Sequence, residues 1–173
     1  MRRKKDAGSS DAGRERAMKN TPGFTFVEAV MVILLLVVLA VVAYPRFAAV
    51  DTARVNGAAM VIAADIRYTQ SLAITTRVNH RIVFSSSTNS YIVERDNAGT
   101  WQTATHPAKG GNFYIALHDD FPGVVLNSSY TIEFNYLGEP VVGGGGSFVI
   151  SYGGSSPAKT ISIVANTGRV RVT

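Results

Sequence analysis

A single carboxylate lies near the start of the longest apolar stretch of the chain. Glu28 is the one acidic or basic side chain in the apolar run from Phe24 to Tyr44. A helix that crosses a bilayer needs about 20 apolar residues, and a charge within it costs about 2.5 kcal/mol or more. We therefore expect Glu28 to have a pairing partner, unless its side chain snorkels to a membrane surface.

Two arginines near the C-terminus are a second feature that could bind a ligand. Arg169 and Arg171 flank Val170, and the period of a strand places both guanidinium groups on one face. Such a pair could contact phosphates with a salt-sensitive affinity that does not depend on sequence. The alternatives are a solvated strand face or ion pairs with nearby acids, for which the candidates are Asp119, Asp120 and Glu133.

No residue pattern predicts catalysis or metal binding. The three histidines lack the spacing of a metal site, and the chain has no cysteine. The run His118-Asp119-Asp120 is expected to be a loop, and two neighbouring carboxylates are little support for a calcium site. No nucleophile-elbow motif is present. We expect a protein that is not an enzyme and has no metal, cofactor or small-molecule substrate. The histidines are His80, His106 and His118.

The positive charge is concentrated at the N-terminus. Residues 1–23 hold seven basic and three acidic side chains, a net +4 out of the formal +5 of the chain. The remainder is close to neutral, which does not favour a strong nucleic-acid binder. Basic residues beside an apolar span favour a cytoplasmic location for that end. An ordinary secretory signal cleaved after Val41-Val42-Ala43 is the main alternative, although the apolar run is longer than usual for such a signal.

The elements that position these residues follow from hydrophobic periodicity. Steps of three and four residues predict one long helix over 25–76, whose second half packs on a sheet. Pro45 should kink or loosen this helix without ending it. The residues expected on the packed face are Val55, Ala59, Ile62, Ile66, Thr69 and Ala73.

After residue 77 the period changes to two, which is typical of strands. Short strands with short links favour antiparallel pairing, so we expect an α+β fold in which the helix covers one sheet face. Gly143–Gly146 is expected to be a flexible loop. The runs expected to be strands are 80–84, 91–95, 113–117, 130–135, 148–152, 161–163 and 170–172.

The N-terminal residues resemble the processing site of type IV prepilins and pseudopilins. The shared features are a basic leader that ends in Gly23, then Phe24, then Glu28 at the fifth place after the glycine, then the apolar run. The resemblance implies that a membrane aspartyl peptidase, the prepilin peptidase, cuts between Gly23 and Phe24. It also implies N-methylation of Phe24. In an apolar bundle, Glu28 could then pair with the Phe24 amine of a neighbouring subunit and fix the register.

The body of the chain resembles the GspH/FimT class of minor pseudopilins and minor pilins. The resemblance rests on 65–73 followed by a hairpin, on 134–140 and on 166–170. In addition, the run 168–171 resembles the GRxR element of DNA-uptake members. The resemblance divides the chain into a leader (1–23), a transmembrane and assembly helix (24–44), an amphipathic helix (45–76) and a β-rich periplasmic domain (77–173).

The sequence therefore predicts a pilin-like minor subunit of a type II secretion pseudopilus or a type IV pilus. The resemblance implies a location at or near the filament tip, after residence in the bacterial inner membrane with the leader in the cytoplasm. The expected partners are the prepilin peptidase, other pilins or pseudopilins, the inner membrane, and secreted cargo or DNA. The alternative function is DNA binding for natural transformation through Arg169 and Arg171.

Overall fold

The computed structural model describes Gly23 and residues 25–173, without the side chains of residues 42–48. The chain divides into two units, one that ends at Val41 and one that extends from Val42 to Thr173. Helix α1 (Phe26–Thr76) contributes residues to both units. The leader that the sequence predicts over 1–23 lies outside the described residues except for Gly23.

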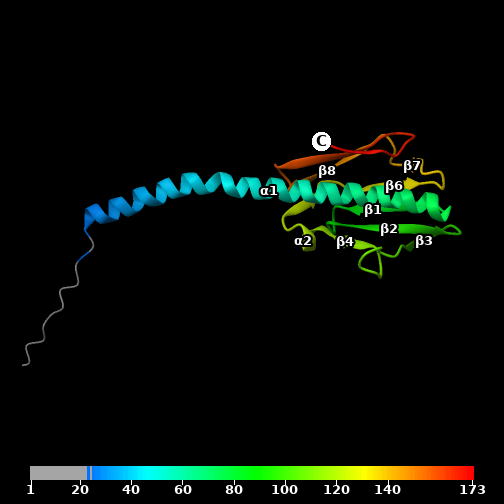
Figure 1. Cartoon of the computed structure of the whole chain (residues 1–173), viewed down its shortest axis with the longest axis horizontal. Coiled ribbons are helices and arrows are strands. Elements are labelled where there is room, and N and C mark those ends of the chain that lie inside the picture. Colours follow the sequence, from blue (N-terminus) through cyan, green and yellow to red (C-terminus); the bar gives the residue numbers. More distant parts are fainter. Residues whose placement is uncertain (1–22, 24) are drawn as a thin grey trace, which may run out of the picture. The chain divides into compact units, whose positions relative to one another are not determined.

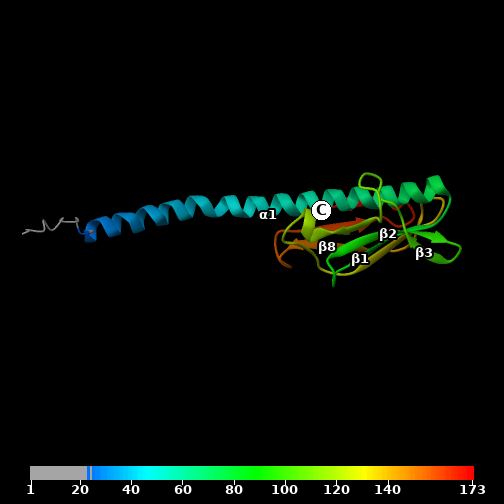
Figure 2. The ribbon, with the colours of Figure 1, turned by 90° about the horizontal axis from the view of Figure 1, so that it is seen from below.

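Helix α1 has nearly the bounds that the sequence predicts, and it continues through Pro45. All six residues of the predicted packed face are at most 1% exposed. Alanines at positions 58, 59, 63 and 73 share this buried face, and their small side chains allow the helix to approach the strands closely. In the second unit α1 runs along one side of the strands (Figures 1 and 2). The amphipathic pattern of residues 55–73 is therefore confirmed.

The strands form two antiparallel sheets, where the sequence predicts one. The larger sheet has the order β3-β2-β1-β6-β7, with β4 also paired to β2, and the smaller sheet has the order β10-β9-β8-β5. The strands of the larger sheet are β1 (His80–Ser85), β2 (Ser90–Asn97), β3 (Thr100–Thr103), β4 (Tyr114–Ala116), β6 (Tyr130–Phe134) and β7 (Pro140–Val142). Those of the smaller sheet are β5 (Val124–Leu126), β8 (Ser147–Tyr152), β9 (Ala158–Ile163) and β10 (Val170–Val172).

Between β4 and β5 lies a short helix, α2 (Leu117–Asp120). The prediction of a loop for His118-Asp119-Asp120 is therefore wrong. The buried side chain of Leu117 and the hydrogen bond from the Phe121 N–H to the Leu117 carbonyl, at 2.8 Å, close this single turn. One turn is too short to show a helical period in the sequence.

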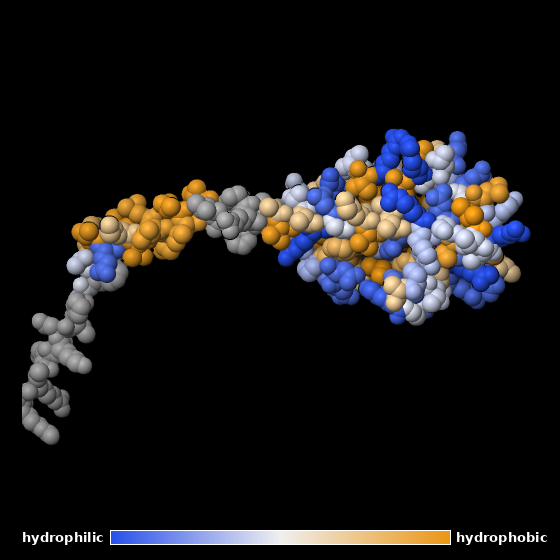
Figure 3. Space-filling view, viewed as in Figure 1, coloured by the Kyte–Doolittle hydropathy of each residue, from blue (hydrophilic) through white to orange (hydrophobic). Residues whose placement is uncertain are grey.

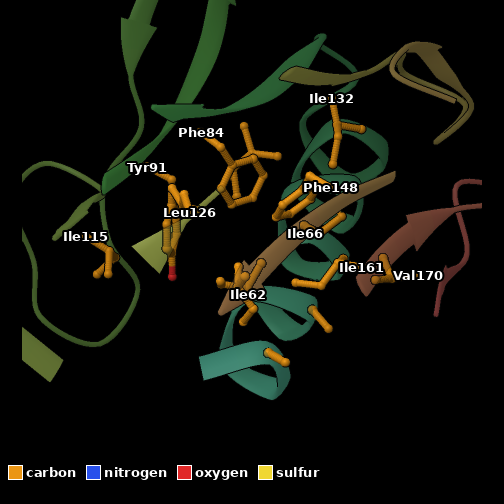
Figure 4. Close-up of a cluster of buried hydrophobic side chains, with 14 of the residues drawn as sticks. Ile62, Ile66, Phe84, Tyr91, Ile115, Leu126, Ile132, Phe148, Ile161 and Val170 are labelled. Atoms are coloured by element: carbon orange, nitrogen blue, oxygen red, sulfur yellow. The ribbon is translucent and has the colours of Figure 1, made fainter. Parts of the chain in front are cut away.

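The core lies between α1 and the inner faces of the two sheets. Phe84 of β1 and Phe148 of β8 join the sheets, with ring centroids 4.5 Å apart. Ile62 and Ile66 of α1 and Ile161 of β9 are fully buried in the same cluster (Figure 4). Burial of a large apolar side chain contributes about 1.5–3 kcal/mol, so this cluster fixes the helix to both sheets.

One polar contact also joins α1 to the larger sheet. The buried Tyr91 hydroxyl donates to the Asp65 carboxylate at 2.5 Å. The sequence places Asp65 away from the packed face, but the structure turns its half-buried carboxylate towards β2.

Gln70 on α1 ties together one turn from each sheet. Its amide nitrogen donates to the Gly138 carbonyl, between β6 and β7, at 2.7 Å. It also donates to the Thr167 carbonyl, between β9 and β10, at 2.9 Å. One side chain thus holds the ends of both sheets against the helix.

Candidate functional site

The start of α1 is closed by a local hydrogen bond. The Glu28 N–H donates to the Thr25 hydroxyl at 3.2 Å, and the Ala29 N–H donates to the Thr25 carbonyl at 3.1 Å. Thr25 is therefore the N-cap residue, and Glu28 is an exposed acid in the first turn. The pattern Thr-x-x-Glu is that of a capping box. A negative charge here also interacts favourably with the helix dipole.

This local role was not part of the sequence interpretation, although the capping signal is present in the residues. The capping box and the helix dipole both favour an acidic residue at position 28, independently of any partner subunit. Among the other two residues of the predicted processing site, Gly23 is exposed, and Phe24 lies outside the described residues. The predictions of cleavage and N-methylation therefore stay predictions.

Apart from Glu28, the residues of α1 from Phe26 to Val41 are apolar around the whole helix. Leu34, Leu35 and Leu36 are each about 60% exposed, although they point in different directions. Figure 3 shows this segment as an almost continuous hydrophobic surface. A helix that is apolar all round is stable when it is surrounded by lipid or by other helices.

Within the described residues, no helix meets the length and hydropathy expected of a membrane span. The predicted span 24–44 includes Phe24, which the structure does not describe.

The arginine pair lies as the strand period predicts. Val170 is 4% exposed, whereas Arg169 and Arg171 on either side of it are exposed. Strand β10 is an edge of the smaller sheet, and Arg171 pairs in register with Ser162 of β9. Both guanidinium groups therefore lie on the solvent side of this sheet.

The acids that were expected as alternative partners of these arginines have other contacts. The Asn79 amide donates to Glu133 at 3.0 Å. Asp120 lies 3.5 Å from the Lys109 ammonium, and Asp119 lies 3.0 Å from the His118 ring. Among the described residues, neither Arg169 nor Arg171 has an acidic partner within 4 Å.

A third arginine approaches the same strand from α1. Arg67 donates to the Val170 carbonyl over a long 3.5 Å contact, so its guanidinium reaches the outer edge of β10. Arg67, Arg169 and Arg171 form the β10 arginine cluster. The sequence analysis missed Arg67, because a helical residue far from β10 in sequence gives no sign of this proximity.

The histidines are far from a metal-binding arrangement in the described part of the chain. No group of three or more His, Cys, Asp or Glu side chains there is placed to hold a metal ion. The His106 ring lies 4.5 Å from that of Phe113, and its Nδ1 accepts from the N–H groups of Ala108 and Lys109. His80, the first residue of β1, is buried.

Comparison with known proteins places the fold. No protein-family model matches the chain, and no curated protein matches it. The chain is similar to the minor pseudopilin EpsH from the type 2 secretion system of Vibrio cholerae, with a TM-score of 0.54 and 14% identity over 69% of this chain and 96% of that one. A crystal structure of the same EpsH gives a TM-score of 0.53 and 14% identity over 70% and 94% of the two chains.

The type IV minor pilin FimU of Pseudomonas aeruginosa is also similar. Its TM-score is 0.50, with 16% identity over 69% of this chain and 87% of that one. At these identities the comparison establishes the fold. The chain has the pilin-like α+β fold of a minor pseudopilin or minor pilin, with a helix packed on an antiparallel β domain.

Proposed function

We propose that this protein is a minor subunit of a type II secretion pseudopilus or a type IV pilus. The pilin-like fold supports this function. The observation that carries it is the apolar surface of residues 26–41, which is exposed on all sides of α1 in the single chain. Packing against the helices of other subunits would cover this surface, and lipid would cover it before assembly.

In this proposal the chain enters the bacterial inner membrane with its leader in the cytoplasm. The prepilin peptidase cuts after Gly23, the new amine of Phe24 is methylated, and the β domain faces the periplasm. The subunit then joins the filament at or near its tip. Mass spectrometry of the chain purified from cells tests the first step, and the expected N-terminus is a methylated Phe24. An N-terminus at Met1 or at Tyr44 would contradict it.

Glu28 has two roles to distinguish, pairing with the Phe24 amine of a neighbour and closing its own helix. Glu28→Gln separates them, because Gln also fits a capping box but has no charge for an amine. We expect Glu28→Gln and Glu28→Ala to be inserted and cleaved normally but to be lost from filaments by about tenfold or more, since a charged hydrogen bond is worth about 1.5–3 kcal/mol. Immunoblotting of sheared filaments measures this.

Thr25→Ala is the matched control, since it removes the cap and leaves the charge. Pairing predicts that Thr25→Ala enters filaments normally. If Glu28→Gln is incorporated as well as the parent while Thr25→Ala is not, the role of Glu28 is local capping and the pairing mechanism is wrong.

DNA binding during uptake is a second candidate function. The observation that favours it is the β10 arginine cluster, in which Arg169 and Arg171 are exposed and the expected acids pair elsewhere. Two guanidinium groups on one face of β10, with Arg67 at its edge, suit a phosphate backbone.

The double variant Arg169→Ala/Arg171→Ala should release DNA at lower salt. Removal of two phosphate contacts reduces the slope of log affinity against log salt by about 1.8 for duplex DNA. Retention of the full chain on immobilised DNA at several salt concentrations measures the slope. The control Arg77→Ala/Lys109→Ala removes the same charge elsewhere, and an equal effect of both double variants would contradict a specific site.

A further inference from the structure

A cavity of about 280 Å³ lies at one end of the larger sheet. It is lined by Leu72 from the last turns of α1, by His80 of β1, and by residues of β2, β3 and the segment after β3. In both Figure 1 and Figure 2 the last turns of α1 lie at the same end of the β domain as β3. The helix ends here, so the inner face of the sheet is open beyond it.

A polar row replaces the apolar core at this end of the sheet. The register pairs His80 with Arg95, and Arg95 with Gln102. Directly paired residues share a sheet face, so all three lie on the side that holds buried Ile82 and Val93 further along. Arg95 and Gln102 are exposed, whereas His80 is buried, so the arginine lies at the solvent-accessible end of the core-facing side of the sheet.

Arg95 has no acidic partner among the described residues. Its neighbours in sequence, Glu94 and Asp96, point to the opposite face of the sheet. Glu94 pairs with Arg81 at 2.6 Å, and Asp96 accepts from the Gly99 N–H at 2.8 Å. The cavity thus has one positive charge that no carboxylate of the described chain neutralises.

His80 supplies a hydrogen-bond acceptor to the same cavity. Its Nδ1 lies 2.8 Å from the Val78 carbonyl, and because a carbonyl only accepts, Nδ1 carries the hydrogen. In the neutral ring Nε2 is then an acceptor. Within the described chain no fully buried side-chain nitrogen or oxygen lacks a partner. Among the described residues Nε2 has no partner, so this atom is not fully buried, and His80 is one of the residues that line the cavity.

The electrostatics favour the neutral ring. Burial, together with the nearby Arg95 charge, lowers the pKa of His80, and the hydrogen bond to Val78 opposes this only in part. The polar side chains on the cavity side of the sheet are therefore the Arg95 guanidinium, the Gln102 amide and the neutral His80 imidazole.

We propose that this cavity binds a carboxylate group that has a hydrogen-bond donor on the neighbouring atom, as at the C-terminal residue of a peptide. The guanidinium of Arg95 binds the carboxylate in bidentate fashion, and Nε2 of His80 accepts from the adjacent N–H or O–H. A single positive charge, with no helix N-terminus among the lining residues, suits a monoanion better than a phosphate dianion. The volume is below the roughly 300–1,000 Å³ of pockets for drug-sized ligands, so it fits one small residue.

The test uses the full chain in detergent micelles and four probes. N-acetylglycine has both the carboxylate and the neighbouring N–H, N-acetylglycinamide lacks the carboxylate, acetate lacks the N–H, and inorganic phosphate is the competing oxyanion. Imidazole and amide NMR shifts report binding. We expect saturable binding of N-acetylglycine with a shift of the His80 Nε2 signal, weaker binding of acetate, and no binding of N-acetylglycinamide.

Arg95→Gln should weaken N-acetylglycine binding about tenfold or more, because the charged hydrogen bonds are lost. Lys159→Gln, which removes a charge from β9 in the other sheet, should leave it unchanged, and the amide spectrum of each variant verifies its fold. The proposal is overturned if N-acetylglycine does not saturate, if N-acetylglycinamide binds equally, or if Arg95→Gln binds like the parent. Phosphate that binds as tightly as N-acetylglycine overturns the assignment to a carboxylate.

Discussion

At the scale of residues, the Asp65–Tyr91 hydrogen bond makes stability depend on pH. Burial raises the pKa of Asp65 above its ordinary value of 3.8, and the hydrogen bond from Tyr91 offsets this only in part. Burial and the Asp65 charge in turn raise the pKa of the Tyr91 hydroxyl, which keeps it a neutral donor. A carboxyl group with a raised pKa in the folded state binds its proton more tightly than the unfolded chain does. The contribution of Asp65 to stability is therefore largest below pH 3.8 and falls as the pH rises through the folded pKa.

Asp65→Asn removes this titration and keeps an acceptor for the Tyr91 hydroxyl. At pH 7 we expect the free energy of unfolding of the variant to equal or exceed that of the parent, by up to about 1 kcal/mol. The advantage should shrink as the pH falls towards 3.8, where the parent carboxyl gains its proton. Urea unfolding followed by the fluorescence of Trp101, the one tryptophan of the chain, measures this difference.

Tyr91→Phe provides the comparison for that experiment. It removes the donor but leaves the half-buried carboxylate, so it should cost about 1–3 kcal/mol at neutral pH. A difference between parent and Asp65→Asn that stays constant from pH 4 to pH 7 would show that Asp65 titrates normally. The Asp65–Tyr91 contact could not be predicted from the sequence, because a polar residue on a helix gives no sign of which strand it meets.

At the scale of elements, the turn between β9 and β10 is fitted closely against α1 and β6. Gly168 has φ +65°, and a Cβ there would lie 2.6 Å from a ring carbon of Phe134 and 2.9 Å from the Gln70 amide nitrogen. A side chain at this position meets both backbone strain and a steric clash. The turn also positions Arg169 and β10, so its geometry supports the arginine cluster.

Gly168→Ala should therefore lower the free energy of unfolding by about 2–5 kcal/mol, the sum of the left-handed backbone cost and of overpacking. Gly153→Ala is the matched control, since Gly153 has φ +57° but nothing within 4 Å of its added Cβ. It should cost only about 1–2 kcal/mol. Denaturant unfolding of the two variants checks the difference, and equal losses would mean that the close approach of Phe134 and Gln70 has no energetic effect.

Strands longer than four residues could be predicted, and of the shorter ones β4 and β10 were predicted whereas β3, β5 and β7 were not. The alternation in 130–134 gives β6 with its bounds nearly correct, and β1, β2 and β8 also follow their apolar periods. In contrast, the three residues of β5 and those of β7 contain no polar residue and so show no alternation, whereas Val170-Arg171-Val172 of β10 alternates. The run Gly143–Gly146, expected to be flexible, is held by a hydrogen bond of 2.6 Å from the Tyr130 hydroxyl to the Gly143 carbonyl.

At the scale of the whole molecule, the fold class was accessible because the helix and strand periods are distinct along the chain. The α+β arrangement with a helix on antiparallel strands is confirmed, and six of the eight buried residues of α1 in the described part of the chain were predicted. The division of the strands into two sheets was not predicted, since β6 pairs with β1 across an intervening 44 residues. Long-range pairing of this kind depends on how the core packs, which periodicity does not encode.

The two hydrogen bonds of the Gln70 amide have a further consequence. The side-chain amide of Gln70 holds both the β6–β7 turn and the β9–β10 turn. Movement of one turn away from α1 would therefore disturb the hydrogen bond to the other. Local unfolding of the final turns of α1 would therefore release the β6–β7 turn and the β9–β10 turn together, as one cooperative event. The aromatic contact between Phe84 and Phe148 would still hold the two sheets together.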